Sequence, residues 1–297
     1  IPAKTIKFME MRKTAFMLSS ILLIGSLVVM GTKRESSLGI DFLGGSIVNI
    51  QLKEGQELSE ATVKKAISDL TLEKNPTIQL EQPVGAEGDL ISIKCATNDL
   101  EKIEKRLRSD RGILGEINTE KNYDIAFDNE TISASLGGEF LKNSFYALGL
   151  GLLAVLFYIS LRFEFSFAVG AFAALFHDIL ICIGVVIMCG TELSLIHVGA
   201  FLTIAGYSIN DTIVVFDRMR ESLRSKRGDV AQVMNLAINA TLSRTILTSV
   251  TTFVAVLVLW IFGGSALKDF SFAIMIGVVV GTYSSIFIAA PVVYIWS

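Results

Sequence analysis

The chain has 297 residues, 52% of them hydrophobic, and a mean hydropathy of +0.57, which together exclude an ordinary soluble globular domain. The formal net charge of −3 gives no reason to expect a nucleic-acid partner. With three cysteines and two histidines that do not cluster, neither a disulfide framework nor the ligand spacing of a metal site is present.

Apolar runs bounded by charged residues indicate six membrane spans. Each run has at least 19 residues, and about 20 residues cross the roughly 30 Å hydrocarbon core of a bilayer. The runs are 14–32, 143–161, 165–191, 193–216, 245–267 and 270–297. The sequence therefore predicts an α-helical membrane protein, with residues 1–32 forming the N-terminus and first helix and residues 143–297 forming helices two to six.

The distribution of basic residues predicts the orientation in the membrane. Lys4, Lys7, Arg12 and Lys13 precede the first span, and the loop 218–244 between the fourth and fifth spans is also basic. Short loops rich in Lys and Arg stay in the cytoplasm. We therefore expect both termini to be cytoplasmic, residues 33–142 to lie on the periplasmic side, and the first span to be an uncleaved anchor.

Residues 33–142 read as a small α+β domain. Its strands are predicted around residues 38–52, 77–82, 89–95 and 123–133, and its helices around residues 59–70 and 98–107. The order strand, helix, strand, strand, helix, strand is that of a ferredoxin-like unit. Gly44 and Gly45 interrupt the first extended stretch and predict a turn or bulge there, not a phosphate-binding loop.

The third span carries a histidine and an acid near its centre, His177 and Asp178. A buried acid beside a histidine can relay protons. Neighbouring positions on a helix diverge by about 100°, however, so the two side chains need not share a face. Two interpretations of Asp178 remain open, a role in ion coupling and a structural hydrogen-bond anchor.

The fourth span is the most unusual stretch because it carries polar groups where hydrocarbon is expected. Thr203, Tyr207, Asn210 and Asp211 fall on one face at helical spacing and form a stripe that can turn away from lipid. An ionised carboxylate inside a bilayer costs several kcal/mol unless water or a partner compensates it. The stripe indicates a proton or ion site, and the alternative is a knot of hydrogen bonds between helices.

The fifth span begins at Arg244 and continues with a row of threonines that includes Thr248. An arginine stays protonated in any protein environment. If Arg244 reaches Asp211, its displacement lets the acid take up a proton, which is the basis of a switch. The alternative is that Arg244 only anchors its helix at the membrane surface.

Three stretches together resemble the SecF family, the smaller membrane subunits of bacterial SecD-SecF protein-export factors. They are residues 39–45, the His177-Asp178 pair and residues 207–221. The resemblance covers essentially the whole chain and implies the resistance-nodulation-division superfamily, in which paired six-span halves use the proton gradient. It also implies that Asp211 matches the family's essential membrane acid, Arg244 its essential arginine, and Asp178 a recurrent acidic position.

The resemblance further implies partners and a location. The partners are a SecD-like six-span half, the SecYEG channel and preprotein substrates, and the location is the lipid bilayer of the bacterial inner membrane. We therefore expect a translocase subunit that uses the proton motive force to promote preprotein export. The alternatives are a proton-driven exporter of small molecules or lipids, and a passive scaffold of the translocon.

An enzyme is not expected. The sequence has no nucleophile and base in a recognisable pattern, no metal spacing and no nucleotide-binding loop, so we expect no cofactor. Nothing next to Asp211 distinguishes H⁺ from Na⁺ as the coupling ion.

Overall fold

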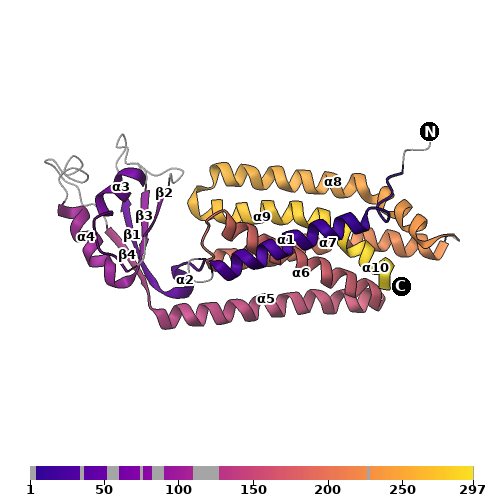
Figure 1. The fold of residues 1–297 in the computed structure, drawn as a ribbon, viewed down its shortest axis with the longest axis horizontal. Helices are drawn as coiled ribbons and strands as arrows, with labels where there is room; N and C mark the ends of the chain where they lie inside the picture. The colour runs from indigo at the N-terminus through magenta and orange to yellow at the C-terminus, as the bar shows by residue number, and fades with distance from the viewer. Residues whose placement is uncertain are drawn as a thin grey trace. The chain divides into compact units, whose positions relative to one another are not determined.

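The computed structural model describes residues 5–33, 37–51, 60–73, 76–81, 90–109, 127–225 and 228–296. The chain divides into two compact units, and each is described by itself. A helical unit contains Ile1–Ser37, Ser144–Trp260 and Asp269–Ser297, and a sheet unit contains Leu38–Asn143 and Ile261–Lys268. Figure 1 shows both units with their helices and strands labelled.

Six helices in the described part of the chain are long and apolar enough to cross a membrane, as the sequence predicts. They are α1 (Arg12–Thr32), α5 (Ala134–Arg162), α6 (Phe165–Met188), α7 (Leu195–Ser225), α8 (Val230–Phe262) and a last span of α9 (Gly264–Ser284), a π-helical segment η2 (Ser285–Ala289) and α10 (Ala290–Trp296). Several helices are longer than their apolar runs, because nothing in the polar flanks stops helix propagation at the membrane surface. Thus α8 begins at Val230 and includes the second half of the predicted loop 218–244.

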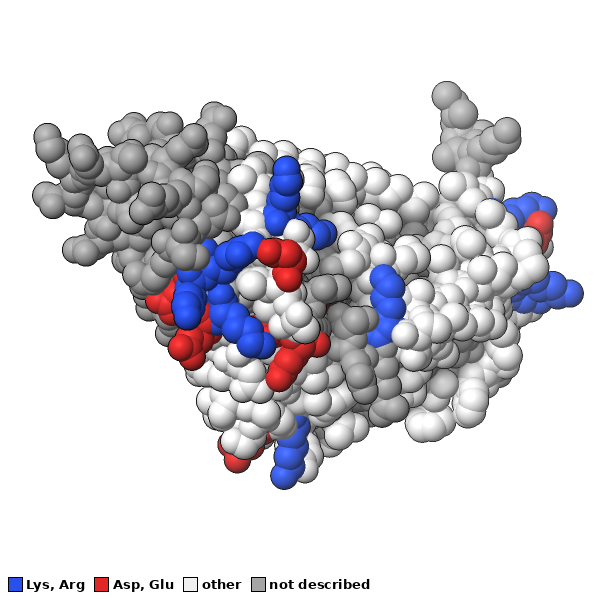
Figure 2. All heavy atoms as spheres, turned by 60° about the vertical axis from the view of Figure 1, so that its left-hand side comes forward, with Lys and Arg blue, Asp and Glu red and all other residues white. Residues whose placement is uncertain are grey.

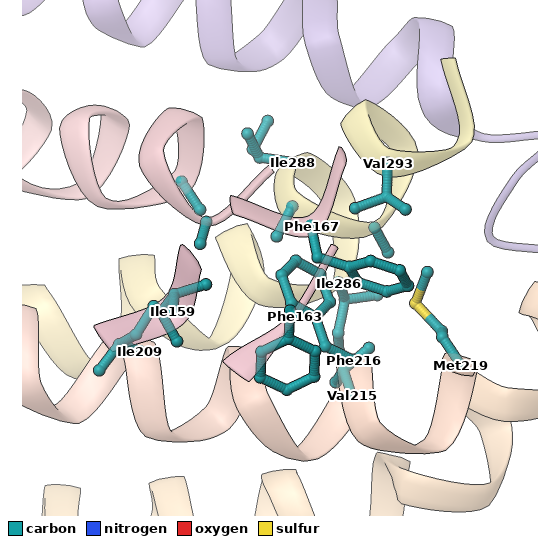
Figure 3. Packing of buried hydrophobic residues seen from close by; sticks show 14 of the residues in the cluster. Ile159, Phe163, Phe167, Ile209, Val215, Phe216, Met219, Ile286, Ile288 and Val293 are labelled. Carbon is teal, nitrogen blue, oxygen red and sulfur yellow. The ribbon is translucent and has the colours of Figure 1, made fainter. Parts of the chain in front are cut away.

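The core of the helical unit lies between α6, α7 and the last span. Phe163, Phe167 and Phe216 gather there with Ile286 (Figure 3). The Phe216 ring meets the other two edge to face, at centroid distances of 6.0 Å for Phe163 and 5.0 Å for Phe167, an arrangement that the quadrupoles of aromatic rings favour. This cluster fixes α7 against α6, and α7 and α6 carry the two acids of interest.

Helices α1, α5 and α8 instead expose many large apolar side chains. Phe157 on α5 and Leu247 on α8, for example, are 67% and 65% exposed. Outward apolar faces on helices of this length are what a bilayer requires, since lipid is the solvent for them. Figure 2 shows the Lys, Arg, Asp and Glu side chains of the described residues on only part of the visible surface.

Glycines bring helices of this unit close together, for example at Gly281 and Gly184. A Cβ atom on Gly281 of α9 would lie 3.0 Å from the Cβ of Ser208 on α7, and one on Gly184 of α6 would lie 2.3 Å from that of Ser26 on α1. Small residues allow this approach in membranes, where packing drives helix association. The contact at Gly281 brings the hydroxyl of Ser208 into the centre of the unit.

The sheet unit has four antiparallel strands in the order β2-β3-β1-β4. In chain order its elements are β1 (Gly45–Gln51), α3 (Glu60–Ile67), β2 (Thr77–Glu81), β3 (Leu90–Cys95), the 3₁₀ turn η1 (Thr97–Asp99), α4 (Leu100–Ser109) and β4 (Phe127–Ile132). Their order and pairing are those expected of a ferredoxin-like unit. Alternate side chains of β1 and β3, such as Val48 and Ile93, are buried with Val63 of α3 and Ile103 of α4.

One local prediction in this unit was wrong. Residues preceding the glycine pair form a short helical segment, α2 (Ile40–Leu43), and not an extended strand. The turn prediction itself is confirmed, because Gly44 has φ 78° and Gly45 has φ 156°. An added Cβ at Gly44 would lie 2.7 Å from the backbone of Ala134, so a tight turn between α2 and β1 requires glycine. Residue 59 of the first predicted helix and residues 123–126 of the last predicted strand lie outside the described residues.

Candidate functional site

Two carboxyl groups are buried inside the membrane-spanning helices. Asp178 of α6 is 0% exposed and Asp211 of α7 is 2% exposed. In the described part of the chain, neither forms an ion pair with a lysine or arginine. Each is instead surrounded by hydroxyl groups, but the hydrogen bonds to Asp178 are short and those to Asp211 are long.

Asp178 is held tightly from three helices. Its Oδ2 accepts hydrogen bonds from Ser208 Oγ of α7 at 2.5 Å and from Ser284 Oγ of α9 at 2.7 Å. Its Oδ1 lies 2.9 Å from Nδ1 of the neighbouring His177. Both hydroxyl distances are at or below the usual length of an O–H···O hydrogen bond. Asp178 therefore joins α6, α7 and α9 at the middle of the helical unit.

The His177 side chain contacts Asp178 although adjacent helix positions point in directions about 100° apart. Its ring is buried and stacks on Tyr283 at a centroid distance of 6.1 Å, while its Nε2 has no hydrogen-bond partner among the described residues. The Tyr283 hydroxyl donates to the Ala15 carbonyl at 2.9 Å and lies 3.1 Å from Ser19 Oγ. The His177-Asp178 pair is thus connected to α1 through a tyrosine.

Asp211 is held much more loosely. Thr248 Oγ1 and Ser249 Oγ of α8 approach its two carboxylate oxygens at 3.5 and 3.4 Å, at the outer limit for a hydrogen bond. Both hydroxyls lie closer to the Thr245 carbonyl of their own helix, at 2.9 and 2.8 Å. A hydroxyl has one proton to donate, so these groups are already satisfied without the carboxylate.

Ser249 also connects α8 to two other helices. Its Oγ accepts a hydrogen bond from the Tyr207 hydroxyl at 3.2 Å and lies 2.6 Å from Thr282 Oγ1 of α9. A line of hydroxyls therefore runs from Tyr207 through Ser249 to Thr282, with Asp211 beside it. Of the predicted supporting stripe, Tyr207 and Thr248 lie in this arrangement.

Arg244 lies near Asp211 without touching it. The side chain is exposed, and no ion pair joins it to Asp211 in the parts of the chain that the structure describes. The predicted pair is therefore separated in this conformation. Thr248 Oγ1, one helical turn further along α8, lies 3.0 Å from the Arg244 carbonyl and 3.5 Å from Asp211 Oδ1.

Thr203 and Asn210 do not join the buried group. Both lie on an exposed face of α7 together with Gly199 and Gly206. A Cβ atom on either glycine would meet nothing within 4 Å, and Thr203 Oγ1 donates only to the carbonyl of Gly199. The fourth span thus has one polar side at Tyr207, Ser208 and Asp211, where Ser208 and Asp211 are buried and Tyr207 is half-buried, and a separate exposed polar side at Thr203 and Asn210. The sequence-based prediction had placed both on one face.

The last span widens immediately beside the site. The π-helical segment η2 begins at Ser285, directly after the Ser284 that donates to Asp178. Pro291 explains the widening, because it has no N–H to donate to the Phe287 carbonyl four residues earlier and its ring would clash there. Single π-helical turns within α-helices are frequent at functional sites.

The hydroxyl groups of Ser249, Thr282 and Ser284 were not predicted from the sequence. Ser208 lies three residues before Asp211, so helical spacing points to it, but Ser249, Thr282 and Ser284 are brought in only by tertiary packing. Within the described ranges, no group of three or more His, Cys, Asp or Glu gathers to hold a metal. The chemistry available at the site is the binding and release of a proton or other small cation.

Comparison with known proteins gives a consistent family. Residues 115–297 match the family model described as protein export membrane protein SecD/SecF, C-terminal. The protein translocase subunit SecF of Rhodothermus marinus is 38% identical over 298 residues, covering 96% of this chain and 91% of the relative. That of Calditerrivibrio nitroreducens is 37% identical over 294 residues, covering 98% of this chain and 93% of the relative.

Two solved structures have the same fold. A crystal structure of SecDF, a translocon-associated membrane protein from Thermus thermophilus, matches with a TM-score of 0.79 and 30% identity over 98% of this chain. A structure of SecDF in a super-membrane-facing form matches with a TM-score of 0.65 and 28% identity over 100% of this chain. The chain spans 38% and 39% of the lengths of those SecDF chains.

Proposed function

The chain belongs to the SecD/SecF family of protein-export membrane proteins, and we propose that it is a SecF-type translocase subunit that couples an ion gradient to preprotein export. Its expected location is the bacterial inner membrane, which the family and the six apolar helices support. The basic residues before and at the start of α1, and those at and after the end of α7, support cytoplasmic termini. The driving ion is H⁺ in the simplest form of the proposal.

This proposal rests on one observation, the weak hydrogen bonding of Asp211. Desolvation makes a carboxylate costly inside a membrane, and the nearest hydroxyls already donate to the carbonyl of Thr245. The carboxyl group therefore gains from taking up a proton or from the approach of a cation. Asp178 accepts two short hydrogen bonds from serine hydroxyls, so the protein itself compensates for its burial. We assign ion exchange to Asp211 and the joining of helices to Asp178.

A switch between two arrangements follows from the position of Arg244. When the guanidinium is apart from Asp211, as it is here, the acid is stabilised by a bound proton. If α8 shifts so that Arg244 contacts Asp211, the ion pair stabilises the carboxylate and the proton leaves. The part of α8 beyond Ser249 favours such movement, because none of residues 250–262 is buried. Repeated uptake of the ion from one side of the membrane and its release to the other side would then drive motion of the helices.

The exposed polar side of α7 supports a membrane partner. An asparagine amide facing lipid leaves polar groups unsatisfied, and small residues spaced along a helix allow another helix to approach closely. Gly199, Thr203, Gly206 and Asn210 provide both features on one exposed face. We assign this face to contact with a SecD-like six-span half, so that Asp211 lies near the boundary between the two halves. The assembled pair would act with the SecYEG channel on preproteins.

The test is replacement of Asp211 in cells that depend on this subunit. Asp211→Asn should abolish gradient-dependent export while the variant still inserts and assembles with its partner. Glu221→Gln, an exposed acid on the same helix, is the matched control and should export normally. Normal export by Asp211→Asn would contradict the proposal. A loss of export that only parallels a loss of the assembled complex would indicate a passive scaffold.

A further inference from the structure

A groove of about 590 Å³ lies between α8 and α9 and continues along η2. Its α8 side is formed by Leu242, Ile246, Val250 and Phe253, and its other side includes Val279 and Phe287. Ile246, Val250 and Val279 are about half exposed, at 48%, 52% and 58%. The volume is within the roughly 300–1,000 Å³ range of ligand sites in proteins. Because both walls are membrane-spanning helices, the medium beside the groove is lipid.

The groove is about as long, measured along α8, as one leaflet of a bilayer is thick. From Leu242 to Phe253 it follows 11 residue steps of α8, which at 1.5 Å per residue is about 16 Å. Half of a hydrocarbon core of about 30 Å is about 15 Å. At the level of Ser249 and Thr282, the bonded hydroxyls of the candidate site form part of the wall. An acyl chain that enters from one membrane surface would therefore lie alongside these two residues.

The N-terminal segment borders the groove at its Leu242 end. The Asn239 side chain accepts a hydrogen bond from the Ile6 N–H at 3.0 Å and donates one to the Ile6 carbonyl at 2.8 Å. Phe8, two residues later, meets the ring of Phe287 edge to face at 5.6 Å. Both Ile6 and Phe8 line the groove. The segment is thus fixed across α8 and η2 where the groove reaches the basic end of the helices.

This end carries positive charge. Lys7 lies between the two lining residues, and Lys13 follows at the start of α1; both are exposed. Lys7 forms an ion pair with Glu10 at 2.9 Å, but both side chains are about two-thirds exposed, at 68% and 65%. Such surface pairs are weak and are readily exchanged for another anion. Basic residues at the end of a membrane helix attract anionic lipid headgroups.

We propose that the groove binds one acyl chain of an anionic phospholipid from the leaflet at the N-terminal end of α1, with the headgroup phosphate beside Lys7. The apolar walls and the one-leaflet depth select an acyl chain, and the basic segment selects an anionic headgroup. The bound chain occupies the space between α8 and α9 next to the Ser249 and Thr282 contact, and so stabilises the spacing of these helices. This inference depends on the membrane location of the helices and not on the proposed ion coupling.

The experiment uses the chain together with its partner half, reconstituted in lipid vesicles. Phosphatidylglycerol or phosphatidylcholine with a photoactivatable group on one acyl chain serves as the probe, and the crosslinked residues are mapped by mass spectrometry. The expected result is a concentration of adducts on 242–253 and 278–287, with more from phosphatidylglycerol. In Val250→Trp the larger side chain fills part of the groove. Displacement of two methylene groups of the acyl chain lowers the occupancy of the groove by lipid about tenfold.

Val258→Trp on the exposed continuation of α8 is the control and should leave the adducts in the groove unchanged. Lys7→Gln should remove the preference for phosphatidylglycerol without removing the adducts. Adducts spread evenly along the exposed side of α8, or unchanged in Val250→Trp, would overturn the acyl site. Equal labelling by the two lipids in the unaltered protein would overturn the assignment of the headgroup. Protein crosslinks to the groove in place of lipid would show that another helix occupies it.

Discussion

Ser208 Oγ donates a 2.5 Å hydrogen bond to Asp178 Oδ2, so α7 is fixed to the buried acid of α6 at a point three residues before Asp211. Asp178 also accepts from Ser284, which ends α9 just before the π-helical segment. A movement of α7 or α9 at this level must therefore break a short bond to Asp178. The two acids have separate roles in this account, since one connects helices and the other exchanges an ion.

Removing one of the hydroxyls at Asp178 should destabilise the protein. Ser284→Ala leaves a buried acceptor with one fewer donor, which costs about 1–3 kcal/mol in the free energy of unfolding. Thermal unfolding of the purified protein in detergent measures this change. Ser160→Ala, an exposed serine that bonds only to its own helix, is the control and should have little effect. Equal stability of the two variants would contradict the structural role of Asp178.

Replacing Arg244 should separate function from stability. Its side chain is exposed and has no ion pair with Asp211 in this conformation, so Arg244→Ala should change the free energy of unfolding by no more than about 0.5 kcal/mol. Gradient-dependent export should nevertheless fall, because the arrangement in which Arg244 meets Asp211 is lost. Arg224→Ala, also exposed, is the matched control. A large loss of stability in Arg244→Ala with normal gradient dependence would favour a simple anchor.

The exposed side of α7 should determine assembly with the partner half. Gly206→Leu places a large side chain where close helix approach is expected, and should reduce the amount of partner that co-purifies with the chain. Gly149→Leu on α5 is the matched control, since an added Cβ there also meets nothing within 4 Å. Co-purification that is unaffected by Gly206→Leu, or equally reduced by both changes, would contradict this assignment.

Cys95 in the sheet unit should be a slowly reacting thiol. Burial, with a smaller contribution from Asp99, raises the pKa of Cys95 from 9.0 to about 11. Because the thiolate is the reactive form, maleimide labelling at pH 8 should be slow in the folded protein and fast in denaturant. The exposed Cys189 serves as the internal control.

The same shift gives a pH dependence of stability. The folded state binds the thiol proton of Cys95 more tightly than the unfolded state does. The contribution of Cys95 to the free energy of unfolding is therefore intact below pH 9.0 and is lost as the pH rises towards 11. Cys95→Ala should remove this part of the decline. Rapid labelling of Cys95 at pH 8 in the folded protein would contradict the account.

The fold was largely predictable because its signals are local. Apolar length predicts the six spans, and the alternation of strand and helix patterns predicts the ferredoxin-like order of the sheet unit. The short helix α2 was missed because Ile40, Phe42 and Leu43 are apolar residues that suit a strand as well, and the tight turn at Gly44 decides the outcome. The length of α8 depends on helix propagation beyond the apolar run, which hydropathy does not report.

The site was predictable only in part. Acids within apolar runs identify Asp178 and Asp211, since any such residue is costly and needs a reason. Helical spacing cannot say which side of α7 is buried, so Thr203 and Asn210 were grouped with Asp211 although they are exposed. The donors to Asp178 come from other helices, 30 and 106 residues away in the chain. Only tertiary packing distinguishes the tightly held acid from the loosely held one.

The central claim is that Asp211 exchanges the ion that drives export. The most direct measurement is the rate of preprotein translocation into inner-membrane vesicles, with and without an imposed proton gradient, for the unaltered complex and for Asp211→Asn. The account predicts that the gradient accelerates the unaltered complex and leaves the variant at the rate seen without a gradient. An equal acceleration of both complexes, at equal amounts of assembled protein, would contradict it.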